Sequence, residues 1–234
     1  MDVWEALQFH GDKGLMKQDT YPDAYHRHFS RFQGSAVTVL EIGVLGGGSL
    51  QMWRTYFGPQ SRIIGLDIDP ECRQHAGEGI EIFIGDQADR AFLESLADEV
   101  GPIAIVVDDG GHEKEQQITS FEVLFPRLSP AGVYACEDVH SSYLPSFGPG
   151  RFGQPHEGSF IEYTKARIDD LHAWFSEGAE PSTFTRSTAS IHIYTSLVVF
   201  ERAPRQPPQA VGSYDQNLIS IPVSDVSTLW TPRR

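Results

Sequence analysis

Runs of β-branched and aliphatic residues alternate with segments of helical periodicity through residues 37–136, and this order constrains the fold more than any single motif. Strand, helix and strand in succession form a βαβ unit, and repeated units build a parallel sheet covered by helices. We therefore expect an α/β fold with a mostly parallel sheet and helices on both faces. The predicted strands are Val37–Ile42, Arg62–Asp67, Ile80–Ile84, Ile103–Val107 and Gly132–Cys136, and the predicted helices are Gly48–Tyr56, Ala88–Val100 and Glu113–Leu128.

Acidic residues and glycines stand at the ends of all five predicted strands. They are the stretch Glu41–Gly48, Asp67, Asp86, the stretch Asp108–His112, and Glu137 with Asp138. The carboxyl ends of parallel strands meet at one edge of the sheet, where open α/β folds bind their ligands. One acid at a strand end is commonplace, but acids at five successive ends predict a ligand site at this edge.

The remaining chain is divided into three parts. Residues 1–34 are expected to form a helical segment near the active site, residues 35–202 the main domain, and residues 203–234 a Pro-rich tail. Within the main domain, the Gly-, Pro- and aromatic-rich loop 141–158 is long enough to act as a lid. A helix is expected at Phe160–Phe175. Two β-like runs in Thr183–Phe200 predict an antiparallel hairpin.

Charge narrows the class of ligand. The chain of 234 residues carries 18 basic and 32 acidic side chains, a net charge of −14. A surface this acidic repels phosphate backbones and anionic lipid, so we expect neither nucleic acid nor membrane as a partner. A neutral or cationic small molecule, or a divalent cation, fits better. With no membrane-length apolar run, no signal-peptide pattern and only Cys72 and Cys136, we expect reduced thiols and a cytoplasmic location.

The glycine-rich loop after the first strand is a candidate cofactor site, because glycines allow a ligand to approach the backbone closely. Leu45 breaks the spacing of a dinucleotide-binding loop, and no Gly-Lys-Ser/Thr follows as in a P-loop. Instead, Glu41-Ile-Gly43-Val-Leu-Gly46-Gly47 resembles the first motif of class I S-adenosylmethionine-dependent methyltransferases. Their fold has a Rossmann-like sheet. The resemblance implies that the cofactor is bound by Glu41, Gly43, Gly46, Gly47, Ser49, Asp67, Asp86, Gln87 and Asp108.

Within that set, Asp67 matches the acid that binds the ribose hydroxyls, and Asp86 with Gln87 matches the adenine-side motif. Ser49 is also a plausible N-cap of the following helix. Two interpretations of Asp108 stay open, a contact with the cofactor or a structural contact. The alternative interpretation of this region is that its glycines only form a tight turn and its acids only cap helices.

A second site is predicted from Asp109, Glu137 and Asp138, which follow neighbouring strands. Carboxylates held close together repel one another unless their pKa values rise or a cation binds. Oxygen-only ligands suit a hard cation such as Mg²⁺. His112 could then take a proton from a substrate hydroxyl as general base. The alternatives are a helix-capping or pocket-filling histidine and a plain acidic strand end.

Asp108-Asp109-Gly110-Gly111-His112 and Glu137-Asp138 resemble the D-D-G-S-H and I-E-D motifs of metal-dependent macrolide sugar O-methyltransferases of the mycinamicin and macrocin type. Gly111 replaces the motif's serine. Gly11-Asp-Lys-Gly14 and the stretch after Asp138 resemble this group and its relatives named cephalosporin hydroxylases. The resemblance implies metal ligation by Asp109, Glu137 and Asp138, and a homo-oligomer.

We therefore expect a methyltransferase that uses S-adenosylmethionine and Mg²⁺ to methylate a hydroxyl of a glycosylated natural product. One alternative is an enzyme for catechol-like phenols, in which the metal chelates adjacent oxygens. Another is a catalytically silent protein that only binds S-adenosylmethionine. A nicotinamide-dependent oxidoreductase is disfavoured by Leu45.

Overall fold

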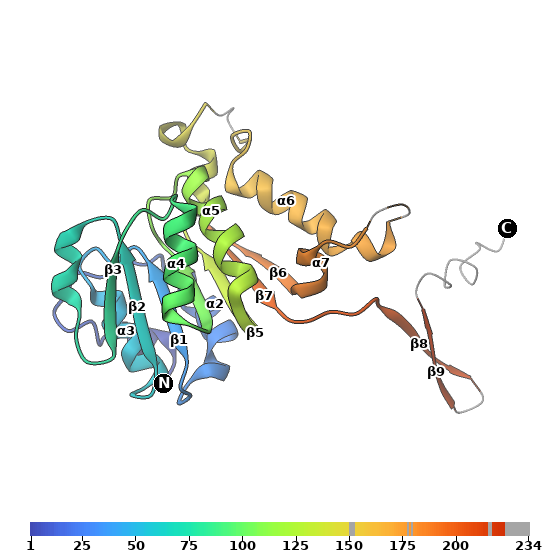
Figure 1. Ribbon diagram of the computed structural model, residues 1–234, viewed down its shortest axis with the longest axis horizontal. Coiled ribbons are helices and arrows are strands. Elements are labelled where there is room, and N and C mark those ends of the chain that lie inside the picture. Colours follow the sequence, from blue (N-terminus) through green and yellow to red (C-terminus); the bar gives the residue numbers. More distant parts are fainter. Residues whose placement is uncertain (150–152, 177, 179, 215–216, 223–234) are drawn as a thin grey trace.

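The computed structural model describes residues 1–149, 153–176, 178, 180–214 and 217–222. Its centre is a seven-stranded sheet with the strand order β3-β2-β1-β4-β5-β7-β6 (Figure 1). The strands are β1 (Thr38–Ile42), β2 (Arg62–Asp67), β3 (Ile80–Ile84), β4 (Ile103–Asp108), β5 (Leu128–Cys136), β6 (Thr188–Tyr194) and β7 (Leu197–Arg202).

The direction of the strands explains where the site forms. Strands β1 to β5 are parallel to one another, and β7 is antiparallel to both β5 and β6. The strand order reverses between β1 and β4, which is the switch point at which open α/β sheets bind ligands. The expected mostly parallel sheet with a C-terminal antiparallel hairpin is confirmed.

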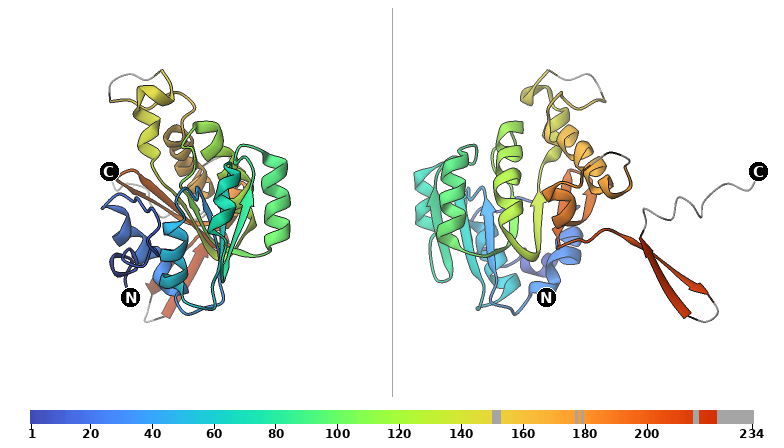
Figure 2. Two further views of the ribbon diagram at one scale, coloured as in Figure 1. Left: turned by 90° about the vertical axis from the view of Figure 1, so that its left-hand side faces the viewer. Right: turned by 45° about the vertical axis from the view of Figure 1, so that its right-hand side comes forward.

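Helices cover both faces of the sheet, as the left-hand view of Figure 2 shows edge-on. On one face lie α1 (Val3–Ala6), α2 (Tyr21–Phe29) and α3 (Gly48–Phe57), whose buried side chains include Tyr25, Phe29 and Trp53. On the other face lie α4 (Arg90–Val100), α5 (Lys114–Leu124) and α6 (Phe160–Leu171), packed through Leu93, Phe121 and Phe160. Each face therefore has its own apolar core against one side of the strands.

The N-terminal segment is part of the domain's packing. Helix α2 starts with Tyr21 and Pro22, a favourable first-turn position for proline, and six of its nine residues are buried. Its rings pack in a continuous aromatic core: Tyr25 stacks on Phe29 with ring centroids 5.5 Å apart and meets Trp53 edge to face at 5.2 Å. This packing fixes the segment on the sheet and sets the positions of the residues before and after α2.

Several predicted boundaries shift. The helix expected over Glu113–Leu128 ends at Leu124 and continues as a 3-10 turn, η3 (Phe125–Arg127), because Pro126 removes a backbone donor. The last predicted helix is α6 followed by η6 (Ala173–Phe175), and a short α7 (Thr183–Ser187) precedes the β6–β7 hairpin. Gly47, with φ of +74°, precedes α3, so Ser49 lies inside the helix and is not its N-cap.

Residues 203–234, expected to be a Pro-rich tail, contain two β-strands that were not predicted from the sequence. Strands β8 (Gln209–Tyr214) and β9 (Asn217–Pro222) pair as a separate two-stranded sheet that stands away from the main domain (Figures 1 and 2). Residues 223–234 of the tail lie outside the described residues, as do 150–152 of the loop predicted to be a lid. The described part of that loop includes the 3-10 turn η5 (Pro145–Phe147).

Cys72 and Cys136 are both buried, free thiols. None of the described helices combines the length and apolar composition needed to cross a bilayer.

Candidate active site

A pocket of about 530 Å³ opens at the carboxyl ends of β1, β2, β4 and β5. Three parts of the chain line it: the N-terminal segment, the glycine-rich loop, and the ends of the central strands. The lining includes Lys17, Tyr21, Gly43, Val44, Leu45, Ser49, Asp67, Asp86, Gln87, Asp109, His112, Glu137 and Asp138. Nine of the thirteen residues predicted from the sequence as site residues therefore surround one cavity.

The glycine-rich loop is shaped by close backbone contacts. A Cβ on Gly43 would lie 2.0 Å from the carbonyl oxygen of Asp109, so the approach of β1 to β4 needs glycine here. Gly46 and Gly47 lie outside the pocket lining, against Gly14 and His75. They hold the loop against neighbouring segments.

Leu45, which disrupts the dinucleotide-binding pattern, stands at the mouth of the pocket. Its φ is +46°, a conformation that is uncommon for leucine, and its side chain is 77% exposed. Met16 and Ile68 also line the pocket and are largely exposed. An apolar rim of this kind can contact the flat or aliphatic part of a bound molecule.

Asp67 accepts backbone hydrogen bonds from the loop. Its Oδ2 is 2.8 Å from the Val44 nitrogen and 3.2 Å from the Leu45 nitrogen, and its Oδ1 is 2.9 Å from the Asp69 nitrogen. Burial alone would raise the pKa of Asp67, but these donors outweigh it and lower the pKa. The carboxylate is therefore held ionised at the pocket wall, and ribose binding by it stays a prediction.

Asp86 and Gln87 point in different directions. The exposed carboxylate of Asp86 accepts the backbone hydrogen of Ala88 at 2.8 Å. The buried amide of Gln87 donates to Asp108 Oδ1 at 3.0 Å and accepts from the Gly111 nitrogen at 2.9 Å. Gln87 thus ties the β3 end to the loop that carries His112.

Asp108 and Glu41 lie outside the pocket lining. Asp108 accepts a 2.7 Å hydrogen bond from the Tyr134 hydroxyl, and burial raises the pKa of Asp108 to about 7. Glu41 is fully buried beneath the glycine-rich loop. Both carboxylates have protein partners, which supports the structural alternative for Asp108. Direct cofactor binding by either residue stays a prediction.

The partner of Glu41 is Lys17, which the sequence analysis did not identify. The Lys17 ammonium lies 3.0 Å from Glu41, 2.7 Å from Asp109 and 2.8 Å from Glu137, and its side chain is only 2% exposed. We call these four residues the carboxylate cluster. Its members are 24, 92 and 120 residues from Lys17 in the chain, so no local motif joins them.

In the carboxylate cluster, the pKa of Lys17, Glu41 and Glu137 depends both on burial and on the charges of the neighbouring members. Burial lowers the pKa of Lys17, but the three carboxylates outweigh burial and raise it well above its usual value. Burial also raises the pKa of Glu41 and of Glu137, and Lys17 opposes this. The lysine therefore remains an ammonium ion that offsets part of the negative charge predicted to hold a cation.

Asp138 and His112 lie on the pocket side of the carboxylate cluster. His112 Nε2 is 3.5 Å from Asp138 Oδ2 and 3.8 Å from Asp109 Oδ1. The other Asp138 oxygen accepts hydrogen bonds from Gln18 at 2.7 Å and Tyr21 at 2.6 Å. The N-terminal segment therefore orients Asp138 and leaves its second oxygen toward the imidazole.

The backbone is strained at the same two residues. His112 has φ of +59° and Asp138 has φ of +52°, in the left-handed region that non-glycine residues rarely adopt. Such strain persists where surrounding contacts determine the conformation, and it is frequent at functional sites. Here Ser141 supplies one such contact, because its hydroxyl donates to the His112 carbonyl at 3.0 Å.

The structure thus brings Asp109, His112, Glu137 and Asp138 together as the sequence predicted. Among the described residues, one compact group of possible metal ligands consists of Asp109, His112 and Asp138, and another of Glu41, Asp109 and Glu137. The second group is the one that Lys17 contacts. Asp109 belongs to both groups, so it links the ammonium to the open side of the pocket.

Comparison with known proteins finds similarity to methyltransferases. A family model described as "Methyltransferase domain" matches residues 40–139, which run from β1 to the end of the β5 loop. The matched part contains all of the predicted site residues. The fold and this match define a class I methyltransferase domain.

Within that class, the chain is similar to sugar O-methyltransferases of antibiotic biosynthesis. It is 39% identical over 193 residues to the 8-demethyl-8-alpha-L-rhamnosyl tetracenomycin-C 2'-O-methyltransferase of Streptomyces olivaceus, covering 78% of this chain and 50% of that protein. It is 36% identical over 189 residues to the mycinamicin VI 2''-O-methyltransferase of Micromonospora griseorubida, covering 76% and 47%. The family resemblance expected from the motifs is confirmed.

A solved structure gives the same result. The MycE methyltransferase, in complex with Mg, S-adenosylhomocysteine (SAH) and mycinamycin VI, superposes with a TM-score of 0.79 at 32% identity. The match covers 87% of this chain and 54% of MycE. The chain spans about half the length of the relatives it matches.

Proposed function

We propose that this chain transfers the methyl group of S-adenosylmethionine to a hydroxyl of a sugar unit on a small natural product, in a reaction that uses Mg²⁺. The observation that carries the proposal is the position of His112. Its imidazole faces Asp109 and Asp138 in the pocket that the glycine-rich loop also lines. A proton acceptor, carboxylate oxygens and a cofactor-type loop thus share one cavity.

The pocket suits S-adenosylmethionine in shape and chemistry. Val44, Leu45 and Ile68 offer apolar contact, while Asp67 and Asp86 offer carboxylate oxygens to hydroxyl or amino groups. When bound, S-adenosylmethionine supplies a methyl group on a positively charged sulfur, which an oxygen nucleophile can displace. The role of the chain is then to place the acceptor oxygen in line with that methyl group.

The acidic residues suit Mg²⁺. Among the described residues, Asp109 Oδ1 and Asp138 Oδ2 pair with the His112 imidazole and form no hydrogen bond. With Glu137, these residues would hold the ion as hard oxygen ligands. When bound, the ion lowers the pKa of a hydroxyl that contacts it. Lys17 limits the excess negative charge of the cluster and fixes the Asp109 and Glu137 carboxylates in place.

His112 takes the role of general base. Its Nε2 faces the pocket, and the loop that carries it is held by Gln87 and Ser141. The nitrogen accepts the proton of the acceptor hydroxyl as the oxygen–methyl bond forms and the sulfur–methyl bond breaks. Its partners Asp109 and Asp138 stabilise the imidazolium that results.

The acceptor is proposed from the relatives. The tetracenomycin relative is named for 2'-O-methylation of a rhamnosyl compound, and the mycinamicin relative for 2''-O-methylation of mycinamicin VI. The acidic chain agrees with a neutral or amino sugar. We also propose that the chain works as a homo-oligomer in the cytoplasm. Its two free thiols agree with that location.

The test is calorimetric titration of S-adenosylmethionine into metal-stripped protein, followed by Mg²⁺ into the cofactor-loaded protein. Both titrations should give saturable binding. The loaded protein should then methylate a rhamnosylated or macrolide acceptor in preference to a catechol. Binding without turnover over both acceptor sets would favour a silent cofactor-binding protein, and preferred methylation of catechol would favour the phenol enzyme. Full activity in the presence of a chelator would contradict the metal's role.

A further inference from the structure

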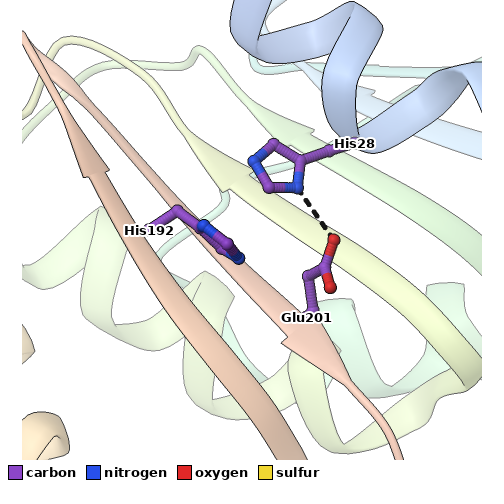
Figure 3. Close-up of side chains that lie close together, drawn as sticks. All are labelled: His28, His192 and Glu201. Atoms are coloured by element: carbon purple, nitrogen blue, oxygen red, sulfur yellow. Dashed lines mark hydrogen bonds and ion pairs between the residues drawn. The ribbon is translucent and has the colours of Figure 1, made fainter.

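A third group of possible metal ligands lies outside the active site, on the face of the sheet that α2 covers. His28 comes from the last turn of α2, His192 from β6 and Glu201 from β7, and their side chains point toward one another (Figure 3). We call these three residues the histidine cluster. Among the described residues, the lining of the active-site pocket includes none of them.

The donor atoms of the histidine cluster are close enough for one ion. One ligand atom from each residue lies within 4.8 Å of the others. His28 Nδ1 is 2.8 Å from Glu201 Oε1, and the centroids of the two imidazole rings are 4.4 Å apart. Two imidazole nitrogens and one carboxylate are a frequent ligand set for Zn²⁺, with a fourth position for water.

The surroundings favour the ligand form of His28. The side chain is buried, and its Nδ1 is held beside the Glu201 carboxylate. Its Nε2 is 2.8 Å from the Tyr194 hydroxyl. A ligating histidine generally uses its second nitrogen in this way, since such a bond fixes the ring. The Ser190 hydroxyl lies 2.9 Å from His192 Nε2 and 3.5 Å from Glu201 Oε2, which fixes the His192 ring beside Glu201.

We infer that the histidine cluster binds a borderline transition-metal ion of the Zn²⁺ type. The ion fastens α2 to the β6–β7 hairpin. The site is separate from the proposed Mg²⁺ site and differs in chemistry. Nitrogen donors favour Zn²⁺, whereas the oxygen donors of Asp109, Glu137 and Asp138 favour Mg²⁺. The inference does not depend on the proposed methyltransferase activity.

One contact opposes the ion. Arg31 Nη1 lies 3.1 Å from Glu201 Oε1, and an ion at that oxygen competes with the guanidinium. The Arg31 side chain is 42% exposed, so it can move into water when the ion binds. Removal of the Arg31 side chain should therefore strengthen metal binding, because it removes the competitor and leaves all three ligands in place.

The experiment titrates Co²⁺ and Zn²⁺ separately into the chelator-treated chain of 234 residues in the presence of excess Mg²⁺. Bound Co²⁺ should show the visible absorption of an imidazole-ligated, four-coordinate ion. His192→Gln should weaken this binding by more than about 100-fold, because even the loss of outer partners of a ligand commonly costs 10–100-fold. His172→Gln, on an exposed histidine outside the cluster, should leave it unchanged.

Two further variants separate this site from others. Arg31→Gln should tighten Zn²⁺ binding, and His112→Gln should leave the Co²⁺ spectrum intact because His112 belongs to the other site. Glu201→Gln gives a second ligand variant, and circular dichroism checks that each variant is folded. Loss of the spectrum in His112→Gln with retention in His192→Gln would overturn the inference. Absence of Co²⁺ and Zn²⁺ binding to the folded wild-type protein would overturn it as well.

Discussion

The carboxylate cluster and the histidine cluster join the same N-terminal segment to the same sheet, yet they differ in charge and donor atoms. Lys17 stands before α2 and meets three carboxylates, while His28 stands near the end of α2 and meets one. In the first cluster, negative charge exceeds positive charge. In the second, Arg31 balances Glu201, and burial lowers the pKa of His28.

The difference shows how position in the fold selects chemistry. The first cluster lies where parallel strands end, so carboxylates from β1, β4 and β5 converge beside a pocket. The second lies along β6 and β7, where side chains of neighbouring antiparallel strands meet across one face. Oxygen-only ligands suit a hard ion such as Mg²⁺, whereas mixed nitrogen and oxygen donors suit a borderline ion such as Zn²⁺.

The largest effect is expected from Lys17→Met. It leaves three buried carboxylates without their ammonium partner, and loss of one partner of a buried ion pair costs about 3–5 kcal/mol. Denaturant unfolding of metal-free protein at neutral pH measures this cost. Lys165→Met is the matched control, because the Lys165–Glu162 pair is exposed and such pairs contribute less than about 1 kcal/mol. Equal costs for the two variants would contradict the buried network.

The Lys17 variant also sharpens the comparison of the two clusters. Mg²⁺ should stabilise Lys17→Met more than the wild-type protein, because the ion then binds a cluster with greater net negative charge. Zn²⁺ bound at the histidine cluster should stabilise both proteins equally. Thermal melting with each ion measures the two shifts, and an equal response to Mg²⁺ would argue against charge compensation by Lys17.

The second prediction concerns His112→Gln. Loss of a general base should lower kcat by about 10²–10⁴-fold, while the affinity for S-adenosylmethionine stays close to that of the wild type. His140→Gln is the control, because this exposed imidazole also lies near Asp138 but bonds to Ser196. Turnover assays and calorimetry give the two measurements. Loss of cofactor binding together with turnover would contradict the base role.

The parallel sheet and the acidic edge could be predicted because both follow from local patterns. Apolar runs such as Ile103–Val107 indicate buried parallel strands, and parallel strands place their ends together. This reasoning brought Asp109, Glu137 and Asp138 into one site from separate stretches of sequence. Side-chain partners that depend on packing were predicted less well, as with Glu41 and Asp108, which face protein groups.

Lys17 and the histidine cluster could not be predicted, for a related physical reason. Lys17 lies in a segment without regular structure, and nothing in its neighbours indicates that it becomes buried. His28 and Glu201 are 173 residues apart, and their contact requires α2 to pack on β7. Such pairs depend on tertiary packing, which periodicity and motif spacing do not describe.

A smaller effect is expected from His28→Gln in chelator-treated protein. Glu201 and the Tyr194 hydroxyl both lose the imidazole, and a buried polar group without its partner costs about 1–3 kcal/mol. Denaturant unfolding should therefore show a cost below that of Lys17→Met and above that of the exposed control His172→Gln. After Mg²⁺ is restored, turnover should match that of the wild-type protein, because His28 lies outside the pocket lining. A cost equal to that of His172→Gln would contradict the buried bond.

The smallest effect is expected in the pH dependence of the folding stability that His28 contributes. Burial, with help from His192 and Arg31, lowers the pKa of His28 in the folded protein, although Glu201 opposes this. As the pH falls below about 6.5, the unfolded chain takes up a proton that the folded protein resists. The contribution of His28 to folding stability is thus fully present above about pH 6.5 and declines as the pH falls toward the lowered pKa of the folded protein.

In chelator-treated protein, the difference in unfolding free energy between wild type and His28→Gln should therefore shrink between about pH 7 and pH 5. Zn²⁺ should steepen this dependence, because metal and proton compete for the same imidazole nitrogens. Mg²⁺ should leave this pH dependence unchanged, because the ion binds oxygens of the carboxylate cluster and no imidazole of α2. A difference that grows on acidification would mean that His28 is charged in the folded protein, and the histidine cluster would then be an ion pair with Glu201.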